Sequence, residues 1–134
     1  MKKQSKAMKG FFLLIVLCLV LTMSAKATES STEIIADLPV KDTVTLLDFG
    51  ATTCIPCKLM APILEEVKQE YKGRAEVIFI NVYDEANAGK AQAYKVMGIP
   101  TQIFYDRHGK EVFRHMGFLD KKSIVARLEE LLGE

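Results

Sequence analysis

Cysteine and net charge are both scarce in this sequence, and each shortage excludes a class of protein. Three cysteines in 134 residues are too few for a miniprotein held together by disulfides. The net charge is only +1, and the first 27 residues hold five lysines and no acid. Thirteen basic and 17 acidic side chains remain in residues 28–134, which therefore carry a net charge of −4. Nucleic-acid binding needs clustered Lys and Arg, so we expect no nucleic-acid partner.

The longest apolar run, residues 10–23, is too short to cross a membrane as a helix. Its fourteen residues would span about 21 Å, against a hydrocarbon core of about 30 Å. A lysine-rich start precedes the run, and the small residues Ala25 and Ala27 follow it. These are the three parts of a secretory signal peptide. We therefore assign residues 1–27 to a cleaved leader, with an uncleaved membrane anchor as the alternative.

This leader predicts that the protein works in the periplasm or is secreted, where thiols tend to be oxidised. Cys18 lies inside the leader as one more small apolar residue, so residues 28–134 keep only Cys54 and Cys57. Residues 28–43 are polar and are predicted to form an N-terminal tail with a short strand or helical turn. Residues 44–134 are long enough for one modest core, and we assign them to a single domain.

Strand-like and helix-like patterns alternate along this domain. Residues 44–50 are mostly apolar β-formers, typical of a strand buried on both faces. Apolar residues then recur at intervals of three and four from residue 57 to residue 71, which predicts a helix ended by Gly73. We predict further strands at residues 75–83, 101–105 and 111–116, and further helices at residues 85–96 and after an N-cap at Asp120.

The resulting order, β-α-β-α-β-β-α, predicts an α/β fold. Its sheet should be mixed, with four or five strands, and sandwiched by helices. The last two strands should form a hairpin through residues 106–109, with a positive φ at Gly109. Four large side chains fall at spacings that favour the core: Phe49, Met60, Phe104 and Phe118.

The sequence Cys54-Ile55-Pro56-Cys57 lies between the first predicted strand and the helix that follows it. A helix N-terminus has unpaired N–H groups and a partial positive charge, which stabilise a thiolate. Cys54 is therefore expected to have a lowered pKa and to act as the attacking thiol. Pro56 suits the first turn, where its missing N–H has no cost. The spacing allows a disulfide, so Cys57 is expected to resolve the mixed disulfide.

Several separated residues resemble the thioredoxin family over about residues 44–132. Asp48 occupies the position of that family's buried acid beneath the redox pair. Pro62 matches its helix-kinking proline, and residues 98–101, Gly-Ile-Pro-Thr, match its cis-proline loop. The resemblance implies a thioredoxin-like fold with a cis Pro100 packed against the sulfurs. It also implies a substrate groove shaped by Ile55, Pro56, Ile99 and Pro100, in which the backbone of Ile99 pairs with an extended substrate.

The sequence departs from the family pattern near the cysteines. It contains no tryptophan, and Gly50 and Thr53 stand where the family commonly has tryptophans. Ile55 replaces the usual glycine between the cysteines. Phe79 stands where many members place a lysine near the buried acid. Without that cation, burial should raise the pKa of Asp48, which would suit proton exchange with Cys57.

The resemblance implies a thiol–disulfide oxidoreductase that needs no cofactor, because the dithiol itself carries two electrons. Only 42 residues separate Cys57 from Pro100, too few for the helical insertion of DsbA-type oxidants, so a role in reducing protein disulfides is favoured. Resemblance and location together imply electrons from a membrane thiol transporter of the CcdA or DsbD type. They also imply delivery to apocytochrome c or other oxidised proteins. We expect the protein to act as a monomer.

Other readings of the cysteine pair stay open from sequence. The protein could be a disulfide oxidant or isomerase, or a non-enzymatic chaperone that binds metal or haem through Cys54 and Cys57. A purely structural disulfide would explain neither the helix-start placement nor residues 98–101. A zinc site is disfavoured because His108 and His115 lie about fifty residues from the cysteines and have poor finger spacing. His108 is expected in a turn, and His115 on a strand surface.

Overall fold

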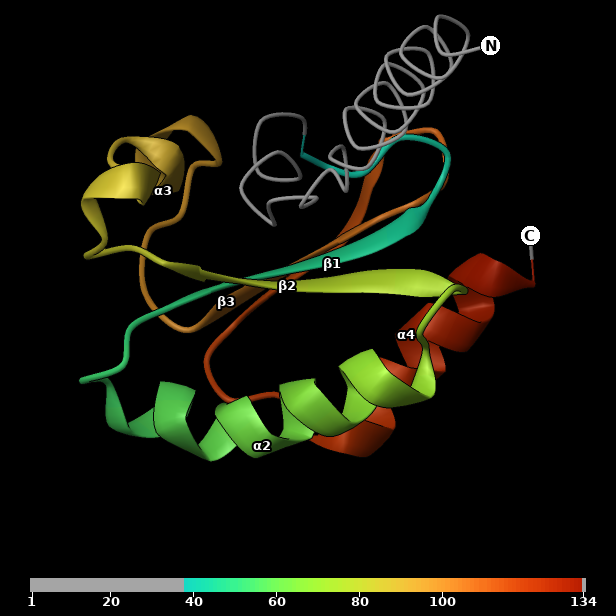
Figure 1. The fold of residues 1–134 in the computed structure, drawn as a ribbon, viewed down its shortest axis with the longest axis horizontal. Helices are drawn as coiled ribbons and strands as arrows, with labels where there is room; N and C mark the ends of the chain where they lie inside the picture. The colour runs from blue at the N-terminus through green and yellow to red at the C-terminus, as the bar shows by residue number, and fades with distance from the viewer. Residues whose placement is uncertain (1–37, 134) are drawn as a thin grey trace, which may run out of the picture. The chain divides into compact units, whose positions relative to one another are not determined.

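The computed structural model describes residues 38–133, which form a four-stranded sheet with helices on both faces (Figure 1). Strands β1 (Val44–Gly50), β2 (Ala75–Asn81), β3 (Thr101–Tyr105) and β4 (Glu111–Met116) are arranged in the order β2-β1-β3-β4. The pair β1–β2 is parallel, whereas β1–β3 and β3–β4 are antiparallel. The predicted mixed α/β sheet is therefore confirmed.

Helices α2 (Ile55–Glu70) and α4 (Lys121–Leu132) cover one face of the sheet (Figure 1). Their apolar sides pack with alternate residues of the strands into the larger part of the core, which includes the fully buried Leu46, Met60, Phe104 and Leu128. Two ion pairs from Lys121 to Glu66 and Glu70 join the exposed sides of the two helices. The opposite face carries a smaller cluster built on Leu47, Phe49, Ile80, Ile103 and Tyr105.

Caps and turns fix the ends of these elements where the sequence predicts them. The Asp120 carboxylate accepts a hydrogen bond from the backbone N–H of Ser123 at 3.0 Å, so it caps α4. Gly73 and Gly109 have φ values of 79° and 75°, a region that favours glycine. The strands at residues 44–50, 101–105 and 111–116 have the predicted bounds.

The predicted helix at residues 85–96 is wrong. The structure instead has a three-residue 3-10 helix, η2 (Glu85–Asn87), and a single turn, α3 (Lys90–Ala93), separated at Gly89. Gly89 has a φ of 80°, which an α-helix cannot contain. The alanine content of the segment favours helix, but this glycine interrupts it.

Three smaller expectations are also corrected. Helix α2 begins at Ile55, two residues earlier than the apolar spacing indicates, because Cys54 itself is the N-cap. Strand β2 ends at Asn81, because β1 offers its last pairing partner, Gly50, at that point. Phe118 is 47% exposed and does not belong to the core, since it follows Gly117 in the connection from β4 to α4.

The leader at residues 1–27 and most of the tail at residues 28–43 lie outside the described residues. Residues 38–43 form bends and turns that lead into β1. The hydroxyl group of Tyr94 donates a hydrogen bond to the carbonyl oxygen of Leu38 at 2.8 Å, which ties this segment to the end of α3. Among residues 38–133, no helix has the length and apolar content needed to span a bilayer.

Candidate active site

Cys54 and Cys57 form a disulfide at the start of α2, with their Cα atoms 5.3 Å apart. Cys54 is the N-cap residue, and its sulfur accepts a hydrogen bond from the backbone N–H of Cys57 at 3.4 Å. Pro56 lies in the first turn, as predicted. The sulfur of Cys54 therefore lies at the positive end of a 16-residue helix, where a thiolate is stabilised.

The two cysteines differ in their access to solvent. Cys54 is partly exposed, whereas Cys57, in the first turn of α2, is 4% exposed. A substrate disulfide can therefore approach the sulfur of Cys54 but not that of Cys57. This asymmetry fits an attacking cysteine and a resolving cysteine in the order that the sequence predicts.

Gly50, the last residue of β1, lies in close contact with the cysteine pair. A Cβ atom at this position would lie 2.8 Å from Cε2 of Phe79 and 3.3 Å from the sulfur of Cys57. The ring of Phe79 thus occupies space into which a side chain at position 50 would project. The glycine at position 50 and the phenylalanine at position 79, two departures noted from the sequence, are therefore sterically linked.

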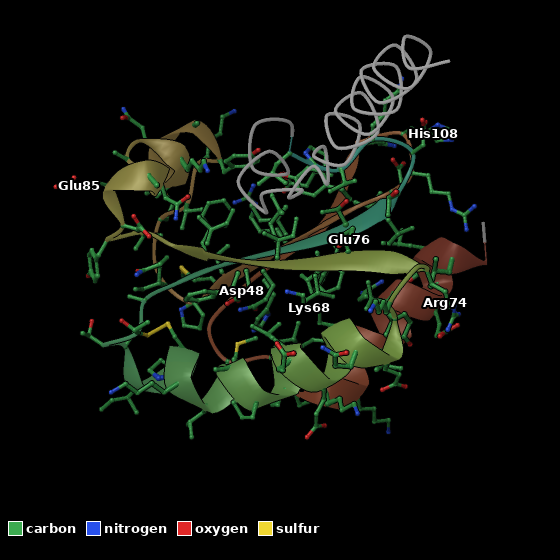
Figure 2. All side chains as sticks on the ribbon, in the orientation of Figure 1. Asp48, Lys68, Arg74, Glu76, Glu85 and His108 are labelled. Atoms are coloured by element: carbon green, nitrogen blue, oxygen red, sulfur yellow. A yellow bond between two sulfur atoms is a disulfide. The ribbon has the colours of Figure 1, made fainter. Side chains whose placement is uncertain are left out.

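Asp48 lies in the middle of β1 and is 1% exposed on the face covered by α2 (Figure 2). Its Oδ1 atom accepts a hydrogen bond from Nε2 of Gln102 at 2.8 Å. Its Oδ2 atom is buried without a hydrogen-bond partner. Burial raises the pKa of Asp48 from 3.8 to about 6, and the hydrogen bond from Gln102 offsets part of that rise. The direction of the shift is the one that the sequence predicts.

The peptide bond between Ile99 and Pro100 is cis, as the family resemblance implies. Pro100 is buried, and its carbonyl oxygen accepts a hydrogen bond from the backbone N–H of Gly117 at 2.8 Å. The sheet register pairs Phe49 with Thr101, so Pro100 lies beside the end of β1 that leads to Cys54. The structure thus brings residues 98–101 to the same end of the sheet as the cysteine pair.

Large apolar side chains remain exposed at this end of the sheet. Ile55 is 74% exposed beside Cys54, and Met97 is 90% exposed beside the loop of residues 98–101. Met116 pairs with Thr101 in the sheet, and its sulfur would lie 3.0 Å from a Cβ atom at Gly98. Exposed apolar side chains that gather around reactive groups indicate a surface for protein partners.

A cleft of about 340 Å³ opens between α2 and β2 beside Cys57. Its floor is apolar, with contributions from Ala61, Leu64, Val77 and Phe79. The charged residues at its rim come from α2 and are Lys58, Glu65 and Lys68. The cleft gives solvent a route to the neighbourhood of the less exposed cysteine.

Residues 38–133 contain no group of three or more His, Cys, Asp and Glu side chains placed to hold a metal ion. His108 lies in the turn between β3 and β4, where its backbone N–H donates to the Asp106 carboxylate at 2.8 Å. His115 is on β4, and its Nε2 atom lies 3.2 Å from the carbonyl oxygen of Phe118. Within residues 38–133, neither histidine forms a hydrogen bond with Cys54, Cys57 or Asp48.

Sequence analysis did not identify Gln102 as part of the site. It is fully buried between Asp48 and Met60, and its Nε2 atom lies 3.2 Å from the sulfur of Met60. The available signal was a long polar residue in a strand, Thr-Gln-Ile-Phe-Tyr, that is otherwise suited to burial. Buried amides are uncommon unless they are hydrogen-bonded, so such a residue warrants attention.

A pair of cysteines that is oxidised at a helix N-terminus, with one sulfur accessible, can exchange its disulfide with external thiols and disulfides. The protein is therefore a thiol–disulfide oxidoreductase. The thioredoxin family profile matches residues 23–130. A thioredoxin of Staphylococcus aureus is 38% identical over 96 residues, which cover 72% of this chain and 89% of that protein.

Solved structures give the same result. Chloroplastic thioredoxin z has a TM-score of 0.61 and 30% identity, over 69% of this chain and 81% of that protein. The exposed lipoprotein thioredoxin of Streptococcus pneumoniae has a TM-score of 0.59 and 26% identity, over 68% of this chain and 87% of that protein. The chain belongs to the thioredoxin family.

Proposed function

We propose that the protein reduces protein disulfides outside the cytoplasm through Cys54 and Cys57. The observation that carries this proposal is the difference in exposure between the two cysteines at the start of α2. In the reduced protein, the thiolate of Cys54 attacks a substrate disulfide and forms a mixed disulfide, releasing one substrate thiolate. The sulfur of Cys57 then attacks Cys54, restores the disulfide and releases the second substrate thiolate.

The resolving step requires Cys57 to lose its proton, and Asp48 is the proposed acceptor. A carboxylate with a pKa of about 6 is mostly ionised at neutral pH and is a stronger base than an ordinary aspartate. The carboxyl group lies on the strand directly before the cysteine segment and faces α2. Asp48 would return the proton to solvent or to a leaving thiolate after each cycle.

Ile55, Pro56, Ile99 and Pro100 are proposed to form the substrate groove. Ile55 is largely exposed beside Cys54, and the cis-proline loop lies at the same end of the sheet. The exposed Met97 and Met116 extend this apolar surface. Methionine side chains are flexible and polarisable, so such a surface suits several extended peptides rather than a single rigid one.

A role outside the cytoplasm is supported by the secretory pattern of residues 1–27 and by the relative described as an exposed lipoprotein thioredoxin. In that compartment the active dithiol needs a source of electrons. We propose a membrane thiol transporter of the CcdA or DsbD type as the donor. Apocytochrome c or other oxidised extracytoplasmic proteins would be the acceptors.

The proposed roles of Cys54 and Cys57 are tested by trapping the mixed disulfide with substrate. With a disulfide-containing protein such as insulin, reduced Cys57→Ser should accumulate a mixed disulfide at Cys54, which mass spectrometry detects. Cys54→Ser is the matched control and should accumulate much less. Trapping at Cys57 instead of Cys54 would contradict the assigned roles.

The direction of electron flow needs a separate measurement. An equilibrium potential of about −270 mV would support a reductant, whereas one of about −120 mV would indicate an oxidant. Stoichiometric binding of copper, zinc or haem that competes with turnover would instead favour a chaperone. Each outcome selects one of the three activities.

A further inference from the structure

One row of side chains crosses the sheet beneath α2, with one residue from each strand. In the register of the sheet, Asp48 pairs with Phe79 on one side and with Gln102 on the other, and Gln102 pairs with His115. Residues that pair directly across strands have their side chains on the same face. Asp48 therefore has an aromatic neighbour on β2 and an amide neighbour on β3.

The hydrogen bond from Gln102 is the single polar contact of the Asp48 carboxyl oxygens within residues 38–133. It joins Nε2 of Gln102 to Oδ1 of Asp48 at 2.8 Å. The two remaining oxygens of this pair, Oδ2 of Asp48 and Oε1 of Gln102, are both buried without a donor. A buried amide with an unpaired oxygen destabilises a fold, and an apolar residue of similar size would avoid that cost. Packing alone therefore does not account for a glutamine at this position.

We propose that Gln102 is a positioning residue that holds the Asp48 carboxyl group in both of its protonation states. This inference rests on the proposed function, in which Asp48 accepts the Cys57 proton. When Asp48 is ionised, the amide N–H group of Gln102 donates to it. When Asp48 is protonated, its hydroxyl group is a donor, and Oε1 of Gln102 is an acceptor that has no other partner.

An amide differs in this respect from a lysine side chain, the residue that the family resemblance implies at the β2 position. A lysine ammonium group can only donate, so it favours the carboxylate alone. A glutamine both donates and accepts, so the carboxyl group can gain and lose a proton without losing its neighbour. In this chain Phe79 occupies the β2 position, which leaves Gln102 as the polar neighbour of Asp48 in the row.

Other titratable groups lie on the elements packed around Asp48, although the shift of its pKa has only two causes, burial and the hydrogen bond from Gln102. Helix α2 contributes Cys57 and the rim residues of the cleft, Lys58, Glu65 and Lys68, and Figure 2 shows Lys68 between α2 and the sheet. Strand β4 contributes His115, whose Nε2 atom contacts the carbonyl oxygen of Phe118. The buried residues of α4 are the apolar Ile124, Leu128 and Leu131.

The first test measures the titration of Asp48 directly. The full chain is labelled with 13C at the aspartate carboxyl groups, and NMR follows Asp48 as a function of pH in the oxidised protein. Gln102→Met keeps the length of the side chain but loses both the N–H donor and the acceptor Oε1. The midpoint should still rise, by about one pH unit, because the hydrogen bond to the carboxylate is charge-assisted and stronger than the neutral bond to the protonated acid. Gln102→Leu serves as a second variant with the same expectation. An unchanged midpoint would overturn the inference.

The second test measures the reaction. The pH at which single-turnover reduction of insulin disulfides is half-maximal should move upward in Gln102→Met, and this movement should vanish in an Asp48→Asn background. Ile103→Met is the matched control, because Ile103 is the next residue of β3, equally buried, and faces the opposite side of the sheet. An equal movement in Ile103→Met would assign the effect to packing and overturn the inference.

The two proposals fail in different ways. If Asp48→Asn leaves the pH profile unchanged, the role of Asp48 as proton acceptor is wrong. If Asp48→Asn changes the profile but Gln102→Met changes neither the profile nor the NMR midpoint, only the role of Gln102 is wrong.

Discussion

Replacing Asp48 by asparagine should stabilise the oxidised protein at neutral pH, although the position is proposed to be essential for turnover. Asp48 is 1% exposed, and burial raises the pKa of its carboxyl group to about 6 from the ordinary value of 3.8. Ionising a group whose pKa is about two pH units higher in the folded state opposes folding by about 3 kcal/mol. Asparagine avoids this penalty because it stays neutral at every pH.

The sign of the effect determines its pH window. A raised pKa means that the folded protein binds the Asp48 proton more tightly than the unfolded chain does. The resulting stabilisation is complete below about pH 4 and is lost as the pH rises through about 6. The difference in the free energy of unfolding between Asp48→Asn and the natural protein should therefore grow from its value at about pH 4 by up to about 3 kcal/mol at about pH 7.

Urea unfolding followed by far-UV circular dichroism, repeated across this pH range, measures the difference. Asp120→Asn is a useful contrast, because hydrogen bonds from Ser123 lower the pKa of Asp120 and its contribution has the opposite pH dependence. Asparagine also retains the ability to cap α4. If the stability difference for Asp48→Asn does not change between about pH 4 and about pH 7, Asp48 does not have a raised pKa, and the argument from its burial is refuted.

Two further variants test contacts around the site and the core. Gly50→Ala should destabilise the protein by about 1–2 kcal/mol and slow the resolving step, because the new methyl group displaces the ring of Phe79. Adding Phe79→Ala should restore much of the stability and of the rate. If the double variant keeps the full defect, this explanation is wrong. Burial raises the pKa of Tyr71 to about 12, and the hydrogen bond from its hydroxyl group to Glu129 adds to the rise. Glu129→Gln should therefore lower this pKa towards 10 in an alkaline absorbance titration. An unchanged midpoint would exclude Glu129 as a cause.

Most of the fold could be predicted from the sequence because local signals and packing agree. The strand at residues 44–50 is mostly apolar and is buried throughout. The final helix has both an N-cap, Asp120, and an apolar stripe that meets the core. The prediction for residues 85–96 is wrong because it rests on helix propensity alone. The left-handed conformation of Gly89 interrupts the helix, and propensity does not reveal it. A four-residue turn has too little apolar surface for periodicity to reveal it.

The site was predictable where its chemistry depends on neighbours in the chain. The helix-start placement of Cys54 and Cys57 follows directly from their spacing after a strand. The partnership of Asp48 and Gln102 joins residues 54 positions apart and depends on the register of β1 with β3. Nothing in the sequence fixes that register in advance. The exposure of Phe118 is not predictable for a similar reason. Its spacing suits a core position, but the residue lies in the connection between β4 and α4, outside both elements.

The two outermost strands of the described sheet differ in how they meet other polypeptides. Strand β4 carries the paired charges of Glu111 and Arg114, and its register with β3 shifts at Phe104 and Tyr105. Charges and irregular pairing discourage a second chain from adding a strand. Strand β2 has one charged side chain, Glu76, and the exposed ring of Phe79. If copies of the chain aggregate by backbone hydrogen bonding between edge strands, β2 is the edge to which a further strand adds more readily.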